Sequence, residues 1–276
     1  MNRSSAIALV IFTGILWSTG GFIIKLISWH PLAIAGIRSG IAFIVVSSYD
    51  KPKKISRDRY TIIGAICFSI MVICFVLGNK LTTAGNTILI QYTAPIYVAI
   101  FGFAFLKEKS RLIDWITIGV VFIGLSLFFL DDLSIKGFWG NIAAIFSGFG
   151  FAGLTLCLRK QKNSRPIDSI LLGNLITFVL CFPFIVQQTT SNFQEWYYII
   201  FLGVIQQGLS YIVFSIAIKN IRALDAVIYT VFEPLFNPFF AYLFLGETMG
   251  VFPIVGGSII FLCVTIRGYY QIKEPL

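Results

Sequence analysis

Two charged side chains fall deep inside long apolar stretches of this sequence. Arg38 lies about seven residues from one end of the apolar run at 31–48, and Glu233 about nine residues from the nearer end of the run at 226–245. A charge in hydrocarbon costs several kcal/mol unless it is paired or hydrated. The two residues therefore indicate a polar cavity. Each also has a structural alternative: Glu233 could stay protonated in a helix bent at Pro234, and Arg38 could extend toward the membrane surface.

Polar side chains at helical spacing accompany these charges. Residues four apart share one face of a helix, so Tyr229, Glu233 and Asn237 form a polar stripe. Gln207 and Tyr211 repeat this spacing in another run. Such groups need partners in lipid, and either a watered cavity or a contact between two helices provides them. The predicted cavity residues are Trp17, Arg38, Gln91, Gln207, Tyr211, Tyr229, Glu233 and Asn237.

Groups for metal, acid–base or nucleotide chemistry are few. His30 is the single histidine, and the five cysteines lie in apolar runs at spacings that fit no zinc site. No two carboxylates lie within one turn of each other inside an apolar run, and no glycine-rich loop with a lysine could bind phosphate. We therefore expect no metal, no cofactor and no enzymatic activity. An integral-membrane enzyme is the alternative from a different class.

Lipid must surround most of this chain. Of its 276 residues, 57% are apolar and 12% are charged, whereas soluble domains carry about 25% charged residues. Continuous backbone in lipid must be helical, because an isolated strand would leave its amides unpaired. Ten apolar runs are long enough to cross a hydrocarbon core of ~30 Å at ~1.5 Å per residue. They cover residues 5–24, 31–48, 60–78, 82–106, 112–130, 138–158, 169–186, 196–218, 226–245 and 250–266.

The basic residues predict how the chain crosses the bilayer. If the N-terminus is cytoplasmic, 17 of the 21 Lys and Arg residues fall in cytoplasmic segments, and only Lys25, Lys80 and Lys136 fall outside. Cytoplasmic loops carry such an excess. We therefore predict a multi-pass protein of the cytoplasmic membrane with both termini inside. The net charge of +9 comes mainly from these loops, and no basic helix or aromatic platform indicates nucleic-acid binding.

The sequence repeats itself once. At a shift of 139 residues the third to fifth runs match the eighth to tenth, and Pro95 meets Pro234; at a shift of 134, Gly14 meets Gly148. Five helices per unit is an odd number, so the second unit must enter the membrane inverted. Inverted repeats are typical of transporters, whose substrate site lies between the halves near the midplane. We predict hinges at both prolines and an all-α fold of two five-helix repeats around a central cavity. The predicted units are residues 1–132 and 133–276.

Three of the runs contain short motifs. They are Trp17-Ser18 followed by Lys25, Gln91-Tyr92-Thr93-Ala94-Pro95 followed by Leu106-x-Glu108, and Glu233-Pro234 followed by Leu245-Gly246-Glu247. These motifs resemble the EamA family of the drug/metabolite transporter superfamily, and with the helix count and the repeat the resemblance covers nearly the whole chain. It implies a basket of ten helices whose cavity opens alternately to each side, and transport of amino acids, other metabolites or toxic compounds, often outward.

The sequence thus favours a secondary transporter that exports amino acids or related amphipathic metabolites by alternating access. Its expected partners are a small-molecule substrate and the lipid bilayer. Two roles are open for Glu233: binding a cationic group of the substrate, or taking up a proton that competes with it. Lipid flipping or passive conduction on the same scaffold is the alternative. The sequence does not specify the substrate, the coupling ion or the oligomeric state, and direction rests on the resemblance alone.

The predicted orientation can be tested by chemical labelling. A cysteine that replaces Lys54 should react with a membrane-impermeant thiol reagent only after the cells are opened, because the loop with most cations is expected inside. A variant with Lys136→Cys serves as the outer-side control. Labelling of the Lys54→Cys variant in intact cells would contradict the orientation.

Overall fold

The computed structural model describes residues 1–50, 55–56, 58–130, 137–188, 192–236 and 250–272. No strand occurs in these ranges, and every regular element is a helix. Eight helical segments of the described chain are long and apolar enough to cross a membrane, and a ninth, Leu112–Phe128, is apolar but shorter. An all-helical membrane protein is therefore confirmed. The run predicted at 226–245 falls partly outside the described residues, so the count of ten helices stays a prediction.

The helices follow the apolar runs, with boundaries that differ by a few residues. In chain order they are α1 (Arg3–Trp17), α2 (Gly20–Leu26), α3 (Pro31–Tyr49), α4 (Arg59–Leu81), α5 (Ala84–Gln91), α6 (Ala94–Leu106), α7 (Leu112–Phe128), α8 (Phe138–Lys160), α9 (Ile167–Val186), α10 (Phe193–Phe201), the π-helix η1 (Leu202–Leu209), α11 (Ser210–Ala217), the 3-10 turn η2 (Ile218–Asn220), α12 (Ala223–Tyr229) and α14 (Val251–Ile272). A short helical stretch at 232–236 follows α12.

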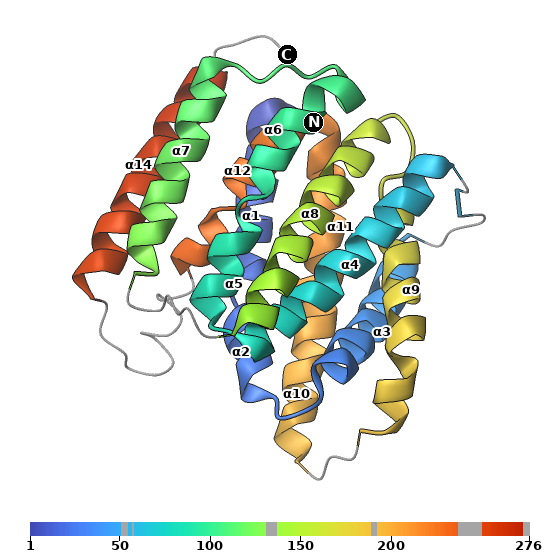
Figure 1. The fold of residues 1–276 in the computed structure, drawn as a ribbon. Helices are drawn as coiled ribbons and strands as arrows, with labels where there is room; N and C mark the ends of the chain where they lie inside the picture. Colours follow the sequence, from blue (N-terminus) through green and yellow to red (C-terminus); the bar gives the residue numbers. More distant parts are fainter. Residues whose placement is uncertain (51–54, 57, 131–136, 189–191, 237–249, 273–276) are drawn as a thin grey trace.

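The helices form one bundle with two distinct edges. Figure 1 shows α7 and α14 side by side at one edge, and α3 with α9 at the other. Between them α4 packs along α8. Close approach of α4 and α8 depends on Gly150, where an added Cβ would lie 2.8 Å from the Met71 amide nitrogen. Small residues at such crossings let the backbones of membrane helices touch.

The described helices are interrupted at three places within predicted spans. The first span is broken at Ser18 and Thr19, between α1 and α2, and the fourth at Tyr92 and Thr93, between α5 and α6. A third break, at 230–231, separates α12 from the helical stretch at 232–236. Interrupted helices leave backbone groups without an intrahelical partner. In a membrane protein this is tolerated where the chain is buried or lines a cavity.

Each of the two predicted hinge prolines stands directly after a break. Pro95 lies in the first turn of α6 and Pro234 in the first turn of the stretch at 232–236. Proline is tolerated there because the first amides of a helix have no partner in any case. Neither proline therefore bends a continuous helix. Their action as hinges stays a prediction.

A glycine of one half covers the break in the other half. An added Cβ at Gly14 of α1 would lie 3.1 Å from the Thr230 carbonyl oxygen and 3.2 Å from the Glu233 amide nitrogen. At Gly148 of α8, the position that matches Gly14 in the sequence, an added Cβ would lie 3.1 Å from the Gln91 carbonyl oxygen. The breaks are thus packed against backbone, with no room for a side chain.

A buried ionic cluster closes the end of the bundle that carries the N-terminus. Its aspartates are Asp114 of α7 and Asp225 of α12, both fully buried. The Arg267 Nη2 atom of α14 lies 2.7 Å from Asp114 and 2.8 Å from Asp225. Arg222 contacts both carboxylates, and Arg3 reaches Asp225. Burial acts to lower the pKa of Arg222, but its bonds to Asp225 and Asp114 outweigh this and raise it above its usual value, so Arg222 stays charged.

A second, smaller set of contacts closes the opposite end. Glu195 of α10 is buried, and it accepts hydrogen bonds from the Ser28 amide at 2.5 Å and from the Trp29 indole at 2.6 Å. The Lys80 ammonium donates to the Ile27 carbonyl. The short connection between α2 and α3 is therefore tied to α10 and to α4. Both ends of the bundle are held by contacts between segments far apart in the sequence.

The contact between α7 and α14 provides a test of this packing. At Gly256 of α14 an added Cβ would meet the Gly124 carbonyl oxygen and lie 2.6 Å from the Phe128 amide nitrogen, so backbone must move. We expect Gly256→Ala to destabilise the protein by about 1–3 kcal/mol, measured as earlier thermal unfolding in detergent. Gly119→Ala on α7, where nothing lies within 4 Å, is the matched control. Equal unfolding temperatures for both variants would contradict the close packing.

Candidate functional site

A small polar cavity lies at the centre of the bundle. Its lining comes from α1, α3, α4, α5, α8, η1, α11 and the stretch at 232–236. The space in which the centre of a water molecule could move is about 30 Å³. One water needs ~10–15 Å³ measured in this way. The cavity therefore has room for a few waters at most, and a metabolite would need it to open.

Six of the eight predicted cavity residues meet at this site. They come from six separate elements, and the fold alone brings them together. The predicted residues that line the cavity are Trp17, Arg38, Gln91, Gln207, Tyr211 and Glu233.

The other two predicted residues are placed differently. Tyr229 is buried, but its hydroxyl lies toward Gly268 of α14 and it does not line the cavity. The predicted stripe through Tyr229 and Glu233 must be corrected. The break at 230–231 interrupts the helix between these two residues, so spacing by four no longer places them on a common face. Asn237 lies outside the described residues.

Arg38 of α3 is a buried cation without a carboxylate partner in the described structure. Its side chain is 3% exposed, and the Nη1 atom donates to Gln206 Oε1 at 3.3 Å. The Nε atom is buried and has no hydrogen-bond partner among the described residues. Gln206 fits here because Gly20 of α2 has no side chain: a Cβ there would lie 2.6 Å from the Gln206 amide nitrogen. A buried guanidinium with an open donor is suited to bind an anionic group.

Glu233 contributes the opposite charge type to the same cavity. Its side chain is 6% exposed. The Tyr92 hydroxyl lies 3.2 Å from Glu233 Oε2 and is also hydrogen-bonded to the Thr230 carbonyl. Although both line the cavity, Arg38 and Glu233 form no ion pair with each other in the described structure. The site thus holds two ionisable groups of opposite type that remain available to a ligand.

Neutral hydrogen bonds fix the cavity walls. The Gln207 side-chain amide donates to Ser39 Oγ at 2.9 Å and to Asn174 Oδ1 at 2.6 Å. The Gln91 amide donates to Ser147 Oγ at 2.9 Å, and the Trp17 indole donates to Ser210 Oγ at 2.8 Å. These contacts cross between helices. In lipid they both satisfy the polar groups and set the positions of the helices.

A π-helix places three of the polar side chains together. Gln206 and Gln207 belong to η1, which runs directly into α11 and Tyr211. The wider turn of a π-helix brings residues five apart onto one face, and such segments are frequent at functional sites. Gln206 and Tyr211, five residues apart, therefore line the cavity together with Gln207.

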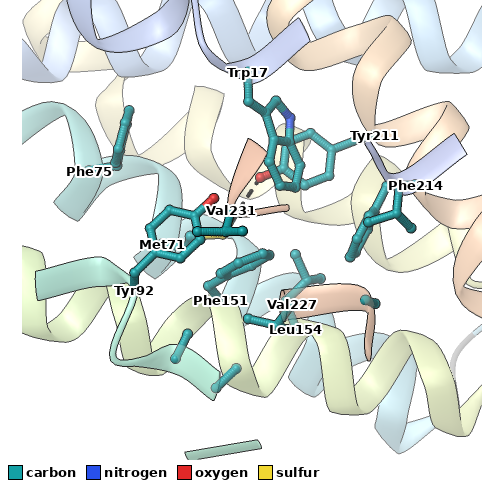
Figure 2. Packing of buried hydrophobic residues seen from close by; sticks show 14 of the residues in the cluster. Trp17, Met71, Phe75, Tyr92, Phe151, Leu154, Tyr211, Phe214, Val227 and Val231 are labelled. Atoms are coloured by element: carbon teal, nitrogen blue, oxygen red, sulfur yellow. Dashed lines mark hydrogen bonds between the residues drawn. The ribbon is translucent and has the colours of Figure 1, made fainter. Parts of the chain in front are cut away.

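Aromatic side chains form part of the wall, among them Trp17, Tyr211 and Phe151. Figure 2 shows Trp17 and Tyr211 packed together, with Phe214 and Phe151 near them. The ring centroids of Trp17 and Tyr211 are 4.9 Å apart, and those of Trp17 and Phe151 are 5.7 Å apart. Rings at these separations pack favourably at tilted or edge-on angles. The cavity therefore combines polar ends with an aromatic surface.

Several lining residues gave no recognisable signal in the sequence. Apolar residues cannot be assigned to a cavity by their type, since most apolar residues of the chain face lipid or other helices. Tyr92 stood in a motif, but its contact with Glu233 depends on two breaks that come together in space. The apolar lining residues absent from the predicted set are Met71, Val72, Phe75 and Phe151. Gln206 was also absent from that set, although it is polar and adjoins Gln207 in the sequence. Across the described residues, no group of three His, Cys, Asp or Glu side chains could hold a metal.

Comparisons with known proteins agree with this arrangement. The model of the EamA-like transporter family matches residues 4–130 and again 138–267. A protein of Archaeoglobus fulgidus named as an uncharacterized transporter is 21% identical over 94% of both chains. The Bacillus subtilis protein named uncharacterized transporter YwfM is 24% identical over 87% of this chain and 86% of its own. One crystal structure shares the fold, with a TM-score of 0.82 at 14% identity, over 99% of this chain and all of the other.

The contribution of the amide network can be measured. We expect Gln207→Leu to destabilise the protein by about 1–3 kcal/mol, because buried Ser39 and Asn174 would each lose a partner. Thermal unfolding in detergent reports the loss. Gln194→Leu, at an exposed site on α10, is the control and should unfold close to the wild-type temperature. Equal shifts for both variants would rule out a structural role of the network.

Proposed function

Because this chain belongs to the EamA-like transporter family, of the drug/metabolite transporter superfamily, we propose that it is a secondary transporter that exports amino acids or related amphipathic metabolites by alternating access. That it is a membrane transporter follows from the family and from its apolar helices. One observation carries the finer proposal. The central cavity holds a buried arginine and a buried glutamate that do not pair with each other.

A zwitterion would supply what each of these groups lacks. A carboxylate of the substrate could accept from Arg38, whose Nε atom has no partner in the described structure. An ammonium group could approach Glu233 on the other side of the same cavity. Buried charges are stable only when they are paired and hydrogen-bonded. The aromatic wall formed by Trp17, Tyr211 and Phe151 suits an apolar side chain between the two charged groups.

The closed ends of the bundle support alternating access. The cavity is too small for a metabolite, and polar contacts tie both ends of the described bundle. Entry of a substrate therefore requires that one set of contacts opens. The ionic cluster around Asp114 and Asp225 would open for access from one side, and the contacts of Glu195 for access from the other.

An inverted repeat would give this exchange its symmetry. We place the two units at residues 1–132 and 133–276, each with five helices, and both termini in the cytoplasm. The two segments matched by the family model support this division. The equivalent packing of Gly14 and Gly148 on the breaks of opposite halves supports it as well. Pro95 and Pro234 are the proposed hinges, since each begins the helix that follows a break.

The role of Glu233 can be tested in reconstituted vesicles. Wild-type protein should catalyse a saturable, exchangeable flux of a labelled amino acid, which separates a carrier from passive conduction. We expect Glu233→Gln to fold and insert normally but to lose at least about 90% of the flux, because loss of one charged hydrogen bond of ~1.5–3 kcal/mol amounts to a tenfold change or more. The flux is measured as uptake of labelled solute over time.

The control and the contradicting result use the same assay. Asp50→Asn removes a carboxylate whose partner, Arg165, lies on the surface, so wild-type flux is expected. If the Glu233→Gln variant transports at the wild-type rate with unchanged pH dependence, the Glu233 carboxyl group has a structural role and no role in transport. Uptake of the labelled solute only by vesicles in which the cytoplasmic face of the protein is turned outward would support export.

A further inference from the structure

The Tyr92 hydroxyl contacts two oxygen atoms that cannot both receive a full hydrogen bond from it. One is the Thr230 carbonyl, which only accepts, and the other is Glu233 Oε2, at 3.2 Å. A tyrosine hydroxyl has one hydrogen to donate, although its oxygen can also accept. If Glu233 were ionised, it would also be an acceptor only. Three oxygens would then share one hydrogen.

A protonated Glu233 removes this conflict. Its carboxyl hydrogen can be donated to the Tyr92 oxygen, while the Tyr92 hydrogen is donated to the Thr230 carbonyl. Every polar atom in this chain of contacts then has the partner that its chemistry requires. An ionised carboxylate at this place would instead be buried without a paired cation, which is strongly unfavourable.

Among the described residues, no charged side chain forms an ion pair with Glu233. From α1, Gly14 places backbone against the Glu233 amide. The titratable groups that face it across the cavity are Arg38 of α3, Tyr211 of α11 and Tyr92. Arg38 instead bonds Gln206, and Tyr211 contacts the Met71 sulfur at 3.6 Å. Tyr92 is therefore the titratable side chain in direct contact with the carboxyl group.

The pair joins the two helix breaks of opposite halves. Tyr92 lies in the break of the fourth span, and Glu233 follows the break at 230–231. At the shift of 139 residues, Tyr92 corresponds to Val231 and Glu233 corresponds to Ala94. The first half thus supplies Tyr92 and the second half supplies Glu233. The position that corresponds to each of them in the other half holds an apolar residue. The contact is specific to the interface of the two breaks and is not a requirement of each repeat.

We propose that Tyr92 is a positioning residue that holds the protonated form of Glu233 and links its proton to the break at 230–231. The inference rests on the proposed transport function for its consequence, but the protonation state can be measured without it. When the cavity opens and Glu233 releases its proton to water, the carboxylate competes for the Tyr92 hydrogen. The Thr230 carbonyl then loses its bond from Tyr92 and keeps the bond from the Glu233 amide at 2.8 Å, so the break is held to the fourth span by one contact fewer and can change its conformation more readily. This link can be tested by changing the pH alone.

Infrared spectroscopy of the purified protein tests the protonation state. At neutral pH without substrate, we expect a carbonyl stretching band of a protonated carboxyl group that is absent from the Glu233→Gln variant. In the Tyr92→Phe variant the band should shift, because the hydrogen bond that the carboxyl donates is lost. A carboxylate at Glu233 in the wild-type protein at neutral pH would overturn the proposal.

The pH profile of transport tests the link. We expect Tyr92→Phe to shift the midpoint of the profile by roughly one pH unit toward acid, because one hydrogen bond changes proton affinity about tenfold. Tyr97→Phe, on α6 and stacked against Phe149 at 3.9 Å, is the matched control and should keep the wild-type profile. An unchanged profile in Tyr92→Phe, with wild-type transport present, would overturn the link. Absence of transport by the wild-type protein would instead contradict the proposed function, and the infrared result would still stand.

Discussion

The hydrocarbon core of the membrane provides no hydrogen bonds, and this constraint governs how every polar group of the protein is placed. A backbone or side-chain group without a partner in lipid costs several kcal/mol. The amides of Gln91 and Gln207 accordingly bond to serines and an asparagine on neighbouring helices. The same requirement explains why neighbouring helices cover the described breaks at 92–93 and 230–231. Gly14 and Gly148 provide that cover because they bring bare backbone against the broken segments.

The breaks give the central cavity its chemistry. An unbroken helix uses nearly all of its carbonyls internally, whereas at the break at 230–231 the Thr230 carbonyl accepts from the Tyr92 hydroxyl as well as from the Glu233 amide. Glu233 follows directly and points into the cavity that Arg38 enters from α3. Polar groups and irregular backbone are therefore concentrated in one small volume. Buried aromatic side chains pack around this volume (Figure 2).

The contacts at the two ends of the bundle differ in kind. At the end that carries the N-terminus, Asp114 and Asp225 are buried with several arginines, so separation would expose charges that are stable only as a group. At the other end, Glu195 binds a backbone amide and an indole. A transporter that opens each side in turn must exchange one set of contacts for water while the other set holds. The two ends therefore present different energetic barriers to opening.

The sequence by itself determined the class of fold and most of the cavity. Apolar runs of sufficient length predicted membrane helices, since only lipid tolerates them, and Arg38 and Glu233 stood out because a charge in such a run is costly. The two matched segments of the repeat could also be aligned from residue spacing. These features are local, and a linear pattern records them. The number of helices and their orientation remain predictions.

Only the tertiary structure decided which of these groups meet. Tyr229 was placed on the Glu233 face by its spacing, but the break at 230–231 separates them, whereas the sequence predicted only a bend at Pro234. Asp114 and Asp225 lie in the first turns of their helices, and in the folded protein they also collect arginines from distant parts of the chain. Tyr92 and Glu233 lie 141 residues apart, and their contact exists because two helix breaks pack together. Such contacts depend on how helices cross, and that is set by packing over the whole bundle.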